Sequence, residues 1–257
     1  MKWFHAIQQR LIHLWKAKER HGVHSPLIYQ LMEKDLRIEL PSSLHIITDY
    51  RQQLMRQPIE WVAQDHGAGS RLNATKILST AVKRASSNEK KGAFLYRWTH
   101  RFQPKTILEL GTHVGISAGY LYLANPNAHL ITIEGDPFLA GYAQAFFKTH
   151  HWNILSMIGT FDEKLSEVFS KEANIDLAVI DGHHNKQATL HYLELIAHHV
   201  SQDAWILIDD IHWSKEMTEA WDSIVHDERY ALTLDFYQYG AIFMGKRNQK
   251  EHFILKW

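Results

Sequence analysis

The sequence predicts an α/β fold with a mostly parallel sheet that ends in an antiparallel hairpin. From residue 104 onward, short β-branched and leucine-rich runs alternate with helical stretches, which is typical of parallel strands joined by helices. One run, 106–110, enters a glycine turn at Gly111 and Gly115 and then a helix. Only four residues, 237–240, separate the last two strands. So short a connection permits only an antiparallel pair.

The strands and helices of this part follow from periodicity and turn residues. Strands are expected at 106–110, 130–133, 153–158, 175–180, 205–208, 230–236 and 241–244. Helices are expected at 116–124, 137–148, 162–170, 188–199 and 214–226. The prediction is therefore a seven-stranded sheet, and its cofactor site belongs at the carboxyl ends of the strands.

The first hundred residues predict helices. Apolar residues recur at helical spacing from 3 to 15, Gly22 ends this helix, and Ser25-Pro26 has the cap-then-proline form that starts another at 27–36. Further helices are expected at 74–84 and 91–101. We therefore divide the chain into an N-terminal helical extension, 1–100, and a ligand-binding domain, 101–257.

Composition excludes several classes of protein. The chain has no cysteine, which rules out disulfides, thiolate metal sites and cysteine nucleophiles. Its formal net charge is zero, without a basic run, so no nucleic-acid partner is expected. The first helix is too polar to span a bilayer or to act as a secretory signal, so we expect a cytoplasmic protein without stable membrane insertion. That helix either packs on its own domain, forms a homodimer, or lies on a membrane surface.

Two N-terminal features leave alternatives open. His21 and His24 either bind a metal or substrate, or form a turn whose imidazoles bond to the backbone. The glycine-containing stretch 67–70 is either a lid hinge or a plain connecting loop.

The residues around the glycine turn indicate the ligand. The pattern E-x-G-x-x-x-G from Glu109 differs from the G-x-G-x-x-G of dinucleotide sites, and a carboxylate before the first glycine favours a cationic ligand over a phosphate. Glu134 ends the next strand, where such folds place the acid that binds ribose hydroxyls. The two carboxylates predict an amino acid linked to a nucleoside.

Four motifs in order resemble those of the class I S-adenosylmethionine-dependent methyltransferases, and among these the small-molecule O-methyltransferases. They begin at Glu109, Ile133, Val179 and Ile208. The resemblance implies a Rossmann-like methyltransferase fold, an S-adenosylmethionine cofactor, a small-molecule acceptor, and an N-terminal segment that covers the substrate. The cofactor-binding residues that follow are Glu109, Gly111, Thr112, Gly115, Ser117, Glu134, Gly135, Thr160, Phe161, Asp181 and His183. Phe161 either stacks on the adenine or belongs to the core.

Asp181, Asp209 and Asp210 follow strands that are expected to be neighbours. Converging carboxylates repel unless a cation joins them, and oxygen ligands suit Mg²⁺ or another hard divalent ion. Catechol-type relatives have Asp-Asn where this chain has Asp209-Asp210, and an Asp-Asp pair resembles metal-dependent sugar methyltransferases. The alternative is that Asp181 contacts the cofactor while the other two cap a helix.

His184 occupies the position of the catalytic lysine in the catechol-type family. A neutral imidazole can accept a proton from a hydroxyl, so we take His184 as the general base with Asp181 as its catalytic partner. His183 and His212 are alternatives. The sequence thus predicts methyl transfer to an oxygen of a small molecule. A nucleotide-dependent oxidoreductase and a non-catalytic binding protein of the same fold are the competing hypotheses.

Overall fold

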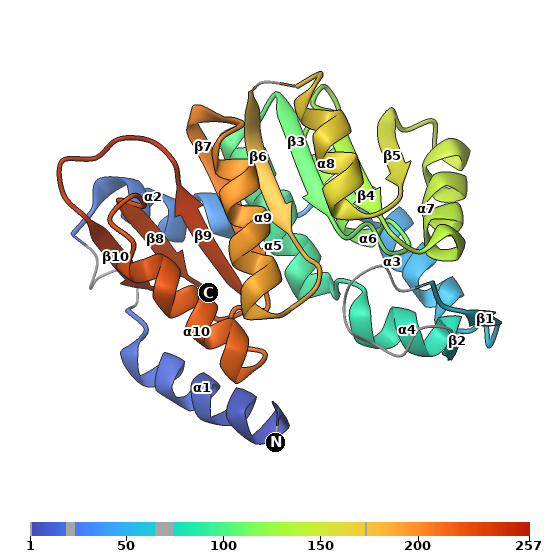
Figure 1. Cartoon of the computed structure of the whole chain (residues 1–257), viewed down its shortest axis with the longest axis horizontal. Helices are drawn as coiled ribbons and strands as arrows, with labels where there is room; N and C mark the ends of the chain where they lie inside the picture. The colour runs from blue at the N-terminus through green and yellow to red at the C-terminus, as the bar shows by residue number, and fades with distance from the viewer. Residues whose placement is uncertain (1, 19–23, 65–73, 173) are drawn as a thin grey trace. The chain divides into compact units, whose positions relative to one another are not determined.

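The computed structural model describes residues 2–18, 24–64, 74–172 and 174–257, with the side chains of 2–4 excepted. The chain divides into two compact units, one made of 1–37 with 172–257 and the other of 38–171. Each unit contains part of the α/β fold, and each is described by itself below (Figure 1).

The unit of residues 38–171 contains three parallel strands in the order β3-β4-β5. Their bounds are β3 Thr106–Leu110, β4 His129–Glu134 and β5 Ile154–Ile158. Helices α6 Ile116–Ala124, α7 Pro137–Thr149 and α8 Phe161–Phe169 connect or follow them. Each of these elements lies within two residues of its prediction. Strands β3 and β4 could be predicted from the sequence because they are almost entirely buried and therefore nearly continuous in apolar residues.

The helices before β3 also belong to this unit. They are the 3₁₀ turn η3 Ser42–Leu44, α3 His45–Leu54, α4 Leu78–Ala85 and α5 Glu89–Phe102. Sequence analysis predicted α5 and all of α4 except its last residue, but it did not predict α3. Asn88 caps α5, and Gly92 of α5 lies against the ring of Tyr120 in α6, where a Cβ atom would come within 2.1 Å of that ring. This glycine is therefore needed for the packing of α5 on α6.

One predicted helix is wrong at its beginning. Thr75–Ile77, expected within a helix from 74 to 84, forms strand β2 and pairs antiparallel with β1, Glu60–Val62. Both strands are short and largely exposed, so neither has the apolar periodicity that sequence analysis uses. Pairing between the two segments decides the conformation here. The stretch 67–70, predicted as a lid hinge or connecting loop, lies outside the described residues, as does His21.

The second unit contains five strands in the order β6-β7-β9-β8-β10. They are β6 Ile175–Ile180, β7 Val200–Asp209, β8 Leu232–Asp235, β9 Tyr239–Phe243 and β10 Glu251–Ile254. The β8–β9 pair is antiparallel, as the short connection predicted, and β6–β7 is parallel. Together with the three strands of the other unit, the described sheet strands number eight rather than seven. The additional strand, β10, pairs parallel with β8 and is too short and polar to read in sequence.

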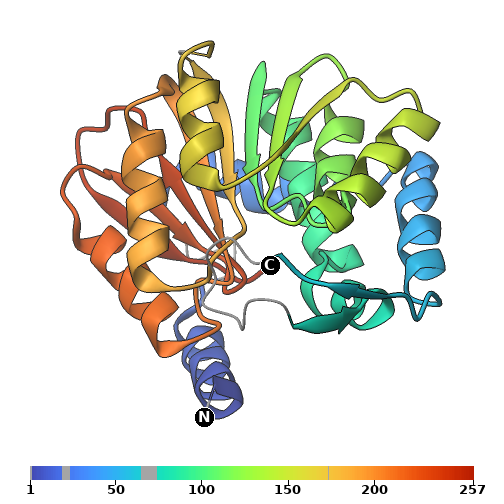
Figure 2. The ribbon, with the colours of Figure 1, turned by 45° about the vertical axis from the view of Figure 1, so that its right-hand side comes forward.

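Helices flank these five strands. They are α9 Lys186–Ala197 and α10 Lys215–His226 between strands, and α1 Lys2–Lys16 and α2 Pro26–Glu33, with the 3₁₀ turn η2 Asp35–Arg37, from the N-terminal segment. Ser214 caps α10 and Pro26 opens α2, as predicted. The Tyr237 hydroxyl donates to the Ala6 carbonyl at 2.7 Å, so α1 is bonded to the β8–β9 connection. Both views show α1 beside α10 (Figures 1 and 2).

Candidate functional site

The turn after β3 has a backbone that only particular residues adopt easily. Gly111 has φ 103° and Gly115 has φ 87°, both in the left-handed region. The Gly111 and Thr112 amides both donate to the Ile133 carbonyl of β4, at 3.0 and 3.2 Å. A Cβ atom on Gly115 would come within 2.8 Å of the Phe147 ring of α7. Gly115 therefore serves the turn and its packing, a reason additional to the ligand approach inferred from sequence.

Glu109 lies beneath this turn rather than on its surface. Its side chain is fully buried, and its Oε2 accepts a hydrogen bond from Thr132 Oγ1 at 2.5 Å. Because Thr132 uses its proton for Glu109, Thr112 must donate in the 2.5 Å bond between the two threonine hydroxyls. Thr112 and Thr132 are fully buried and Ser117 nearly so. The predicted residues Glu109, Thr112 and Ser117 are thus brought together into one buried polar cluster with Thr132.

The environment of Glu109 fits a cationic ligand. Burial raises the pKa of Glu109 to about 7, although hydrogen bonds from Ser117 and Thr132 oppose that shift. Its Oε1 atom is buried and has no hydrogen-bond partner among the described residues. A buried acceptor without a donor is costly, and a ligand ammonium group would satisfy it. The partly exposed His113, whose pKa desolvation lowers to about 4, adds no competing positive charge at neutral pH.

Glu134 holds the same turn from the end of β4. Its Oε2 accepts from the His113 amide at 2.7 Å, and its Oε1 accepts from the Asp136 amide at 2.9 Å. Burial raises the pKa of Glu134 above its ordinary value, against hydrogen bonds from the Asp136 and His113 amides. Each carboxylate oxygen can accept a second hydrogen bond, so Glu134 retains acceptor capacity for two ribose hydroxyls.

A contact that sequence analysis missed lies next to Glu134. Asp136 caps α7 through the Phe138 amide, and its Oδ2 accepts from Trp61 Nε1 of β1 at 2.8 Å. The Trp61 and Phe138 rings stack with centroids 4.9 Å apart. Strand β1 is therefore fixed beside the end of β4. Asp136 could have been found from the Asp-Pro helix start, whereas nothing in the sequence pairs it with Trp61.

Thr160 and Phe161 lie at the start of α8. Thr160 caps this helix in a reciprocal capping box with Glu163, and the preceding Gly159 amide donates to the Glu134 carbonyl at 3.0 Å. Phe161 is only 7% exposed, as the core interpretation requires. The Thr160 hydroxyl accepts from the Glu163 amide, so its first role is structural.

The predicted catalytic residues lie in the other unit, in the loop after β6. His184 Nε2 lies 3.5 Å from Asp181 Oδ1, an ion-pair distance longer than an ordinary hydrogen bond. His183 has φ 61°, and its ring meets Tyr192 of α9 edge-on with centroids 5.5 Å apart. Asn185 Nδ2 donates to the His183 carbonyl at 2.7 Å and its Oδ1 caps α9. This loop places Asp181 and His184 together and turns His183 toward α9.

The acids after β7 differ in burial and backbone. Asp209 is 3% exposed, whereas Asp210 is partly exposed, has φ 54°, and donates its amide to the Gln238 carbonyl at 2.7 Å. No three His, Cys, Asp or Glu side chains in the described part of the chain are grouped to hold a metal ion. The described structure thus does not group Asp181, Asp209 and Asp210 as metal ligands, and the metal site stays a prediction.

His212 belongs to a different cluster of side chains, which is centred on Asp235. Its Nε2 lies 2.8 Å from Asp235 Oδ2, and His13 Nε2 of α1 lies 3.3 Å from Asp235 Oδ1. Burial alone would raise the pKa of Asp235, but hydrogen bonds to His13 and His212 outweigh it and hold that pKa well below its ordinary value. His212, an alternative base in the sequence analysis, is bound to a buried carboxylate. His24, the described member of the predicted pair His21 and His24, is exposed.

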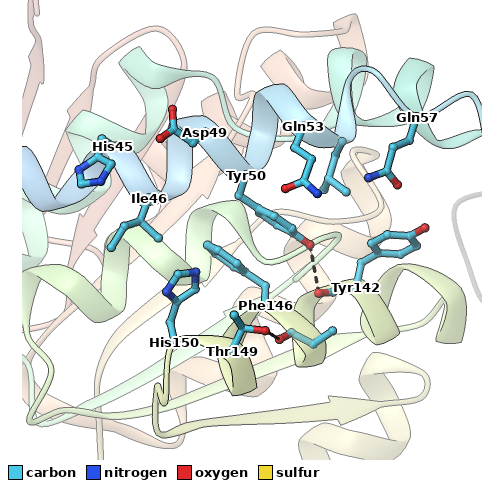
Figure 3. A pocket seen from close by; sticks show the side chains of 12 residues that line it. His45, Ile46, Asp49, Tyr50, Gln53, Gln57, Tyr142, Phe146, Thr149 and His150 are labelled. Carbon is cyan, nitrogen blue, oxygen red and sulfur yellow. Dashed lines mark hydrogen bonds between the residues drawn. The ribbon is translucent and has the colours of Figure 1, made fainter.

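A groove of about 510 Å³ lies between α3 and α7 in the 38–171 unit. Figure 3 shows the Tyr50 ring lying over Phe146, with centroids 3.8 Å apart, and the Tyr50 hydroxyl donating to the Tyr142 carbonyl. None of the residues that line this groove was predicted to bind the cofactor or a metal, or to act as the general base. The groove is therefore separate in composition from the predicted site.

Residues 108–211 match a family model described as a methyltransferase domain. This match spans the glycine turn and the strand ends that carry the candidate acids. The chain therefore contains a methyltransferase domain over these residues. The oxidoreductase hypothesis is thereby set aside. A search of curated protein sequences gave no significant match.

Solved structures support the methyltransferase fold. An O-methyltransferase from Bacillus cereus in complex with SAH is 16% identical, with TM-score 0.57, over 84% of this chain and 94% of that chain. A SAH-bound methyltransferase from Podospora anserina is 16% identical, with TM-score 0.61, over 88% and 97%. An O-methyltransferase from Streptomyces achromogenes in complex with SAM is 13% identical, with TM-score 0.58, over 85% and 96%. At these identities the likeness establishes the fold of the methyltransferase.

Proposed function

We propose that the protein transfers a methyl group from S-adenosylmethionine to an oxygen of a small-molecule acceptor. The observation that carries the cofactor part is the buried, unsatisfied Oε1 of Glu109 beneath a glycine turn that Glu134 holds in shape. The choice of oxygen is supported by the O-methyltransferases among the structures of similar fold.

Within this proposal the two carboxylates have separate tasks. The cofactor supplies a methyl group activated by its sulfonium charge. Glu109 Oε1 accepts from the ammonium group of the cofactor, and Glu134 accepts from its ribose hydroxyls while still holding the His113 amide. Gly111 and Gly115 keep the turn in the left-handed conformation that brings these groups together.

His184 would accept the acceptor's proton. Its Nε2 faces Asp181, so the other ring nitrogen, Nδ1, is the one available to a hydroxyl. In this reaction the acceptor oxygen would attack the methyl carbon, the carbon–sulfur bond would break with its electrons going to sulfur, and the proton would pass to His184. Asp181 stabilises the imidazolium that forms. His183 and Thr160 remain proposed contacts of the cofactor at the edges of its site, and Phe161 at its adenine.

A divalent cation was expected at Asp181, Asp209 and Asp210. Because these carboxylates are not grouped as metal ligands in the described chain, we derive no step through a metal. The proposed proton acceptor is sufficient for a phenol or another hydroxyl of lowered pKa. The acceptor class itself stays a proposal.

Turnover with a labelled methyl group tests this function. We expect radioactivity from methyl-labelled S-adenosylmethionine to enter a phenol or polyhydroxyl compound from a panel, and not its fully O-methylated analogue. Transfer to an amine or thiol panel instead would contradict the oxygen assignment while leaving the methyltransferase intact. Binding of S-adenosylhomocysteine without turnover on any acceptor class would favour the non-catalytic alternative.

A further inference from the structure

Helix α1 is attached to its unit through its polar side. His13 lies against Asp235, and His5 Nε2 is 3.0 Å from Thr218 Oγ1 of α10. A pocket of about 460 Å³ separates parts of α1 from α10 and the strands, and four of its thirteen lining residues are histidines. The contacts that fix α1 are therefore mainly hydrogen bonds and ion pairs.

The apolar side of α1 faces outward. Ile7, Leu11, Leu14 and Trp15 are 41, 64, 49 and 85% exposed. Their spacing of four, three and one residues puts them on one stripe of the helix. An amphipathic helix that packs only on its own domain turns such a stripe inward, since burial of apolar area is the main favourable contribution to packing. Because this stripe faces outward instead, we infer that a hydrophobic surface outside this chain covers it.

The charges of this segment distinguish two possible partners for the stripe, a second copy of the protein and a lipid bilayer. Residues 2–18 include Lys2, Arg10, Lys16 and Lys18 and no acidic residue. A second copy that placed α1 against α1 would bring cations together without compensation. Anionic lipid headgroups complement the same charges, and an exposed tryptophan beside lysines is typical of helices that lie at a bilayer surface.

We propose that α1 binds the surface of an anionic lipid bilayer, with Ile7, Leu11, Leu14 and Trp15 inserted at the headgroup level. No helix in the described residues is long and apolar enough to cross a membrane, and α1 has only 15 residues, so it would lie in the plane of the interface. The His13–Asp235 contact would keep the methyltransferase attached to the bound helix.

Vesicle co-sedimentation of the full chain tests this proposal. The protein should sediment with vesicles of phosphatidylcholine mixed with phosphatidylglycerol and much less with phosphatidylcholine alone, and added salt should weaken the binding. The triple variant L11S/L14S/W15S should bind at least about tenfold more weakly. Lys18→Gln should weaken binding roughly fivefold.

Two control variants change exposed leucine or lysine side chains outside α1. L40S/L155S changes two exposed leucines outside α1, which are 38 and 47% exposed, and should bind vesicles as the original chain does. Lys215→Gln, with a side chain 82% exposed, is the control for charge. Unchanged binding of S-adenosylhomocysteine by the triple variant would show that it is folded.

Two results would overturn the proposal. One is equal sedimentation with both kinds of vesicle, or with neither. The other is a dimer by light scattering that L11S/L14S/W15S abolishes while vesicles have no effect on the original chain. That second result would assign the stripe to another copy of the protein.

Discussion

The turn after β3 and the acids after β6 and β7 differ in how far the folded chain prepares them. In the first region Glu109, Thr112, Thr132 and Glu134 are fixed by bonds to one another and to the turn. In the second, Asp181 has a loose 3.5 Å contact with His184, and no three acidic or imidazole groups form a metal site among the described residues. We infer that the proposed cofactor region is preorganised, whereas the proposed acceptor region depends on what binds there.

The largest expected effect is on the chemical step. His184→Ala should lower kcat by about 10²–10⁴-fold because it removes the proton acceptor, and should leave the Kd for S-adenosylhomocysteine unchanged. Single-turnover kinetics with the labelled cofactor measure this. His198→Ala, which changes an exposed histidine at the other end of α9, is the control. A normal rate in His184→Ala would exclude this residue as the base.

The buried cluster should make stability depend on pH. The pKa of Glu109 is about 7 in the folded chain and 4.5 ordinarily, so its contribution is fully present below about 4.5 and is lost as pH rises through 7. Between pH 5 and 8 the ligand-free protein should lose about 2–3 kcal/mol of unfolding free energy from this group. Glu109→Gln should remove most of that slope in urea titrations.

The control for this measurement is Glu228→Gln, whose side chain is 86% exposed and should not alter the slope. Glu134, with a pKa raised in the same direction, contributes part of the slope that remains in Glu109→Gln. If Glu109→Gln kept the full pH dependence of the unfolding free energy, the raised pKa of Glu109 would not be its cause.

Glu134→Ala should weaken S-adenosylhomocysteine binding by about tenfold or more, since charge-assisted bonds to the ribose are lost. Calorimetry measures this. Because Glu134 also accepts from the His113 and Asp136 amides, Glu134→Gln is the companion variant, which keeps one acceptor oxygen and should lose less. Equal affinity in the original protein and both variants would remove Glu134 from the cofactor site.

The smallest expected effect is that of metal removal. After EDTA treatment the rate should stay within about twofold of its starting value, because no step of the proposed reaction uses an ion. A loss of activity that Mg²⁺ restores would show that Asp181, Asp209 and Asp210 assemble when the ion or acceptor binds. The contrast between the two regions would then describe only the ligand-free protein.

The alternation of strands and helices, the glycine turn and the positions of the acids could all be predicted from residue order. These follow from short-range causes: buried strands such as Thr106–Leu110 are continuous in apolar residues, and Asp-Pro or Ser caps start helices. The β8–β9 hairpin was equally accessible because its short connection permits one geometry.

Contacts between residues far apart in the sequence became known from the folded chain. The burial of Glu109 under Thr132, the bond from Trp61 to Asp136, and the capture of His212 by Asp235 join segments that no local pattern relates. The same holds for β1, β2 and β10, which are strands because a partner segment supplies their hydrogen bonds. Burial and pairing are properties of the folded chain, so the pKa of a carboxylate and the direction of the α1 stripe could not be obtained from residue order alone.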